Sequence, residues 1–166
     1  MRLFRFPFVL VAVAALVCAT SNRSQARLMT VLSYKELLDK SDLVVIATPK
    51  SKTTDTKEQA YLPNIMRQDE NGNQRRVDAI GVETVFVVAA VLKGDQTIRR
   101  FTLHHYREAE TGVAEMNGPL LVFFDPDTSD RSSYLLFLVR QPDGRYAPTG
   151  GQTDAGYKSI NRVDSE

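Results

Sequence analysis

The chain has 166 residues, 43% of them hydrophobic, with 21 basic and 20 acidic side chains, two histidines and one cysteine. This length suits one domain of ordinary size with room for a proper core. The near-neutral balance argues against a nucleic-acid-binding domain, which needs a basic footprint, and a single cysteine excludes a disulfide framework.

Residues 1–26 are expected to be a secretory signal peptide. Arg2 and Arg5 precede a short apolar run, and small and polar residues follow it. A positive start, a short apolar core and small residues before the cut are typical of such a segment, with cleavage expected after Ala19 or Ala26. The apolar run is shorter than the roughly 20 residues that span a membrane, which disfavours a single-pass anchor.

Removal of residues 1–26 takes away Cys18, three arginines and no acid. Subtracting these three from the 21 basic residues leaves 18 against 20 acids, a balance of −2, and no thiol. Leu16 and Val17 stand where a lipoprotein signal has small residues, which argues against a lipid anchor. The sequence therefore predicts a secreted or bacterial periplasmic protein with no stable membrane span after cleavage, and an uncleaved, anchored form is the less favoured alternative.

A short helix is predicted from Tyr34 to Lys40. Ser33 and Glu36 have the spacing of a capping box, in which each side chain bonds the backbone N–H of the other. Leu43–Thr48 is a continuous apolar run rich in β-branched residues that stops at Pro49, and this predicts a central strand.

Residues 50–79 are predicted to be the least structured part of the domain, a polar insertion. Tyr61–Ile65 is its apolar island, and Asn71–Gly72 is a turn signal. An insertion of this length is unusual in a compact domain, so we expect it to be mobile or functional. The adjacent arginines Arg75–Arg76, like Arg99–Arg100, are expected to be solvated charges.

Further strands are predicted from alternating or continuous apolar runs at residues 80–92, 97–106, 120–124 and 133–140. Pro142–Arg145 is predicted as a tight turn, with Pro where φ is preset and Gly where positive φ is needed. Tyr146–Pro148 is predicted as a short edge strand, because Pro148 cannot donate to a ladder. Asp125–Asp130 is expected to be a solvated turn, since it lacks the Gly and Glu of an EF-hand calcium loop.

Taken together, these elements predict a mainly β domain over residues 27–166. We expect a small antiparallel, OB-like closed barrel of five to six strands with one short N-terminal helix.

Some pieces of the pattern also match a known family in their order: Ser41–Ala47, the "LKGD" turn within Val91–Asp95, the strand Tyr134–Leu138 and the following Asp143–Tyr146. This order resembles the netrin-like module and the tissue inhibitors of metalloproteinases, as used by many exported bacterial proteins. The resemblance covers nearly the whole mature chain and implies an OB-type barrel. Those inhibitors chelate the protease zinc through an N-terminal cysteine, whereas cleavage here would expose Thr20 or Arg27. The resemblance therefore implies a fold and not an inhibitory chemistry.

No catalytic residue, cofactor site or metal site is predicted. His104 and His105 are neighbours on a strand and point to opposite faces, so they cannot readily share one metal. One is expected in or near the core and the other on the surface. No G-x-S-x-G elbow positions a serine beside either histidine. The weak candidates for a ligand-binding surface are His104, His105, Tyr106, Arg99 and Arg107.

We therefore expect an exported, non-enzymatic binding or interaction module that needs no cofactor. Its expected partner is a protein, a peptide or an envelope glycan, and not a nucleic acid. Two alternatives stay open: a hydrolase whose carboxylates the sequence cannot group, and a protease inhibitor acting through residues 50–79.

Overall fold

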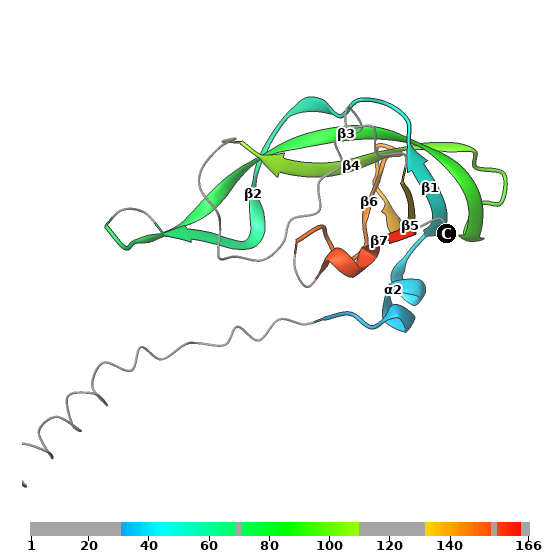
Figure 1. Ribbon diagram of the computed structural model, residues 1–166, viewed down its shortest axis with the longest axis horizontal. Helices are drawn as coiled ribbons and strands as arrows, with labels where there is room; N and C mark the ends of the chain where they lie inside the picture. Colours follow the sequence, from blue (N-terminus) through cyan, green and yellow to red (C-terminus); the bar gives the residue numbers. More distant parts are fainter. Residues whose placement is uncertain (1–30, 69–70, 110–131, 154–155, 164–166) are drawn as a thin grey trace, which may run out of the picture.

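The structure is a computed structural model that describes residues 31–68, 71–109, 132–153 and 156–163 (Figure 1). The elements in chain order are α2 (Tyr34–Lys40), β1 (Leu43–Pro49), β2 (Thr54–Gln68), β3 (Gln74–Lys93), β4 (Arg100–Glu108), β5 (Ser133–Arg140), β6 (Tyr146–Pro148), the 3-10 helix η1 (Gly156–Ser159) and β7 (Ile160–Val163). The expected signal segment, the strand at 120–124 and the acidic stretch at 125–130 lie outside the described residues.

The short helix α2 and its capping box are confirmed. The Ser33 hydroxyl accepts from the Glu36 N–H, and the Glu36 carboxylate accepts from the Ser33 N–H at 2.8 Å. Such a cap stabilises a helix by about 1 kcal/mol. Of the helix side chains only Leu37 is buried, where it packs against Val44 and Phe137.

Five strands close into a barrel in the order β1, β3, β4, β6 and β5, and β5 pairs with β1 to complete the ring. Four of the five junctions are antiparallel, but β4 and β6 run parallel, paired at Leu103 and Tyr146. The predicted closed barrel is confirmed, and the purely antiparallel arrangement is wrong. The reason is parity, because strand directions that alternate around a closed ring of five must agree at one junction.

Side chains fill the barrel interior. The fully or nearly buried core residues alternate along their strands, as expected for a sheet with one face inward; they are Leu43, Val45, Ala47, Phe86, Phe101, Leu103, Leu136, Leu138 and Ile160. Phe86 stacks on Phe101 with ring centroids 5.4 Å apart, and Tyr146 meets Phe101 edge-on at 5.7 Å. Each such large side chain stabilises the fold by about 1.5–3 kcal/mol.

The polar insertion at 50–79 is largely strand, which corrects its prediction as the least structured part. We call residues 54–68 and 71–81 the arm: β2 and the first part of β3, joined near Gly72, whose φ of 83° suits the predicted turn. The arm projects away from the barrel (Figure 1). Its small core consists of Leu62, Ile65, Val77 and Ala79, with Tyr106 packed against it. That core and the pairing with β3 explain why so polar a segment is ordered.

The tight turn before β6 is confirmed, since Gly144 has φ 89° and donates its N–H to the Gln141 carbonyl at 3.0 Å. The prediction that β6 is an edge strand is wrong, because β6 lies between β4 and β5. Pro148 is tolerated there since it pairs only with Leu138 of β5, and the bridge to β4 is made by Tyr146.

Candidate functional site

The structure brings together only two of the five residues predicted as a ligand-binding surface, His104 and Tyr106. Arg99 lies exposed before β4, where its guanidinium bonds the carbonyls of its own loop, at 2.9 Å for Gln96. The prediction that one histidine lies on the surface is wrong. Their side chains do point to opposite faces, but His104 is 3% exposed and His105 is 0% exposed.

His105 points into the barrel and belongs to a buried chain of polar groups. Its Nε2 lies 2.8 Å from the Thr84 hydroxyl, which in turn lies 2.7 Å from the Thr53 hydroxyl. Burial lowers the pKa of His105 to about 3, with a smaller electrostatic contribution from the neighbouring His104, so the His105 ring is neutral near pH 7. A hydroxyl beside an imidazole is the geometry of nucleophilic catalysis. Here Thr84 and His105 are both fully buried, so no substrate can reach them.

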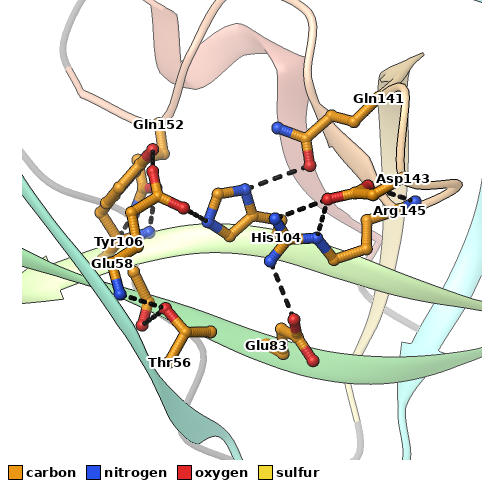
Figure 2. A network of polar contacts seen from close by, with 10 residues as sticks. Thr56, Glu58, Glu83, His104, Tyr106, Gln141, Asp143, Arg145 and Gln152 are labelled. Atoms are coloured by element: carbon orange, nitrogen blue, oxygen red, sulfur yellow. Dashed lines mark hydrogen bonds and ion pairs between the residues drawn. The ribbon is translucent and has the colours of Figure 1, made fainter.

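His104 lies on the outer side of the barrel wall, between the arm and the turn after β5 (Figure 2). Its Nε2 is 3.1 Å from a Glu58 carboxylate oxygen, an ion-pair distance that lacks the alignment of a hydrogen bond. Its Nδ1 is 3.1 Å from the Gln141 side-chain oxygen. The imidazole also packs against Tyr106, with ring centroids 5.2 Å apart.

Tyr106 ties the same carboxylate to β4. Its hydroxyl donates to Glu58 at 2.6 Å, and burial, with this bond to Glu58, raises the pKa of Tyr106 to about 12. The buried Gln152 side chain bonds both backbone groups of Tyr106, each at 2.6 Å. Gln152 thus takes the place of a neighbouring strand at this residue.

Gly81 makes this junction possible, because β2 passes very close to it. A Cβ on Gly81 would lie 2.8 Å from the Thr56 hydroxyl oxygen and 3.1 Å from His104 Nε2. The Thr56 hydroxyl donates to the Gly81 carbonyl at 2.8 Å and accepts from the Glu58 N–H at 3.1 Å. We call this junction the arm root; its residues are Thr56, Glu58, Gly81, His104, Tyr106 and Gln141.

A second group of charges lies beside the arm root. Arg145 donates to Glu83 at 2.8 Å and lies 2.7 Å from an Asp143 oxygen, as Figure 2 also shows. The bond to Arg145 lowers the pKa of Asp143. Two nitrogens of the Arg107 guanidinium donate to the two carboxylate oxygens of Asp55, one of them at 2.8 Å, and this interaction lowers the pKa of Asp55. Arg107 therefore links β4 to β2 through an ion pair, and its guanidinium is already occupied and not available to a ligand.

Farther out, the arm carries a shallow pocket of about 30 Å³ that we call the arm pocket. Its lining residues are Arg67, Arg75, Arg76, Val77, Asp78 and Glu108. Arg67 donates to Glu108 at 2.9 Å, and the Arg76 guanidinium lies over the Tyr61 ring, 5.6 Å from its centre. The expectation that Arg75 and Arg76 are merely solvated charges is thus incomplete, since both line a hollow and Arg76 stacks on an aromatic ring.

Most of the residues in the arm root and the arm pocket could not be predicted from the sequence. The sequence predicts Asp143 and Arg145 only as turn residues. Glu58 and Gln141 carried no signal at all, because their partners lie far away in the chain. The exposed Tyr61 and the arginine pair were visible, but only the register of the arm places them side by side.

Among the described residues, no cluster of three or more His, Cys, Asp or Glu side chains is arranged to hold a metal ion, and no helix is long and apolar enough to cross a membrane. Comparisons with protein-family models, curated proteins and solved structures find no match for this chain. The features of the described residues that bear on function are therefore the arm and its two polar sites, the arm root and the arm pocket.

Proposed function

We propose that this chain is an exported, non-enzymatic binding module whose protein partner docks on the outer face of the arm. The observation that carries the proposal is the two-sided arm. One face holds its small core, and the other exposes Tyr61, Met66 and Arg76.

The register of the hairpin defines that outer face. Tyr61 pairs with Asp78, and Met66 pairs with Arg76, and residues paired across two strands share a face. All four side chains are exposed, with Tyr61 at 55% and Met66 at 39%. Aromatic residues, Met and Arg are enriched in protein interfaces, and Tyr and Arg dominate their energetic hot spots. A protein or peptide partner therefore suits this face better than a glycan does.

The arm root supports the same proposal, because a docking arm must be held in a fixed pose. Glu58 is engaged by both His104 and Tyr106, and the close approach at Gly81 fixes where β2 leaves the barrel. A preorganised surface loses less conformational entropy on binding.

The enzymatic alternative has less support among the described residues. The barrel interior is packed, and the one hydroxyl–imidazole pair found there is sealed from solvent. Protease inhibition through residues 50–79 is a special case of the proposed function, since those residues form most of the arm. We further propose that the barrel is of the netrin-like, OB type, supported by the sequence pattern together with a closed ring of five strands. The proposed export to the periplasm or exterior rests on residues 1–26.

The test is site-specific photo-crosslinking within the exported fraction. A benzophenone amino acid replaces Tyr61 in one sample and Leu92 in the other. Leu92 is the matched control because it is 57% exposed but lies at the far end of β3. We expect a discrete protein adduct from position 61 only. Equal adducts at both positions, or no adduct from position 61, would overturn the docking proposal, and turnover of a small substrate by the purified protein would overturn its non-enzymatic part.

A further inference from the structure

We infer that the arm pocket binds a carboxylate group of an acidic segment in the partner. The inference rests on the proposed function, because the pocket shares Arg76 and Asp78 with the proposed docking face. It adds the chemistry that the surface recognises.

The charge of the pocket favours an anion. Three arginines line it against two carboxylates, Asp78 and Glu108. Glu108 is already bonded to Arg67, and these two side chains are only 23% and 15% exposed, so one wall of the pocket is a fixed ion pair. Arg75 is exposed and makes no ion pair with any residue that the structure describes. Its guanidinium is the cation available to an incoming group.

The size of the pocket selects a small group. A volume of about 30 Å³ holds roughly one or two water-sized groups, which matches the two oxygens of a carboxylate. A guanidinium is planar and binds a carboxylate through two parallel hydrogen bonds. Arg75 can therefore orient a bound carboxylate as well as neutralise its charge.

The place of the pocket connects it to the outer face of the arm. Arg76 lines the pocket while its guanidinium lies over Tyr61. Arg75 pairs with Arg67 and therefore lies on the opposite face of the hairpin from Arg76, so the pocket is lined from both faces. A partner that covers Tyr61 and Met66 and extends past Arg76 would bring its neighbouring residues to Arg75. An acidic residue next to an apolar one in the partner fits this arrangement.

Two fluorescent hexapeptides with blocked ends, hexaglutamate and hexaglutamine, test the inference at low ionic strength. We expect hexaglutamate to bind the intact domain at least about tenfold more tightly than hexaglutamine. We expect the double variant Arg75→Gln/Arg76→Gln to lose about tenfold in affinity for hexaglutamate. The matched control is Arg99→Gln/Arg100→Gln, which removes the same charge from the other adjacent pair and should change the affinity by less than about twofold.

Three results would overturn the inference: no preference for hexaglutamate, an equal loss in both double variants, or displacement of hexaglutamate by inorganic phosphate but not by acetate at equal ionic strength. The last result would assign the pocket to phosphate. These outcomes are distinguishable from failure of the proposed function. If the crosslink at position 61 forms but the arginine variants bind hexaglutamate normally, only the carboxylate assignment fails. If hexaglutamate binds as expected but no adduct forms, the docking proposal fails.

Discussion

Acidification from pH 7 to pH 5 should destabilise the fold through His105. Its pKa is about 3 in the folded chain because the ring is buried inside the barrel, against about 6.5 when it is solvated in the unfolded chain. Between these values the unfolded chain binds a proton that the folded chain does not. Stability therefore falls as the pH drops below about 6.5, and it continues to fall until about pH 3.

The magnitude follows from proton linkage. If the folded state takes up no proton at His105 between pH 7 and pH 5, its share of the loss is about 2 kcal/mol over that interval. The exposed carboxylates with lowered pKa values, such as Asp55 and Asp143, do not contribute in this window. Their unfolded pKa values lie near 4, and their stabilisation is lost only at lower pH.

Urea denaturation at a series of pH values measures the effect. The variant His105→Gln keeps a polar group near Thr84 but does not titrate, so its stability should fall by about 2 kcal/mol less than that of the natural chain over the same interval. Thr84→Val is the control. It removes the hydroxyl that meets His105, should cost about 1 kcal/mol at every pH, and should leave the pH dependence intact. An unchanged pH dependence in His105→Gln, or an NMR titration of His105 in the folded chain near pH 6.5, would refute the reasoning.

Three further predictions concern the arm root and the helix. Gly81→Ala places a Cβ 2.8 Å from the Thr56 hydroxyl oxygen, so we expect a loss of about 1–3 kcal/mol and faster amide exchange in β2, whereas Gly144→Ala, with φ 89° and no crowding, should lose stability without affecting β2 exchange. Glu58→Gln should bring the pKa of Tyr106 down from about 12, since it removes the charge that the phenol faces, and ultraviolet titration of tyrosine reads this directly; an unchanged titration would mean that burial alone sets the value. Ser33→Ala should cost about 1 kcal/mol in urea denaturation by removing the capping box, while Ser33→Asp should restore most of it; equal losses in both variants would contradict the role of the cap.

Elements with local physical causes could be predicted from the sequence. The helix from Tyr34 to Lys40 follows from its cap, the β1 strand from a run of β-branched residues, and the turn before β6 from its proline and glycine. Each of these depends on neighbours within a few residues. The closed barrel also followed, from the number of strands and the lack of helices between them.

The remaining features depend on pairings between distant residues. β2 was missed because its polar composition hides a strand that is stabilised by β3 and by one small apolar cluster. His104 is buried by contacts with Glu58 of the arm and with Gln141 of the turn after β5. The sequence around residue 104 contains no signal for either of these distant contacts. The alternation of side chains along β4 therefore predicts correctly that His104 and His105 point to opposite faces, but it does not predict that His104 is buried. The parallel junction could have been foreseen for a ring of five, but the sequence left the count at five or six.

That parallel junction also makes the barrel unequal around its circumference. β4 and β6 meet at a single residue pair, Leu103 and Tyr146, and three residues farther along β4 the backbone of Tyr106 is bonded, on the side away from β3, by the Gln152 side chain and not by a strand. The ring therefore has a seam, and it should be the first place to separate when the protein opens locally. His104 lies on β4 at this seam, between Leu103 and Tyr106, and contacts the arm. If a partner docks on the arm as proposed, the load that it places on the arm would pass through His104 and β4 to this single-bridge junction.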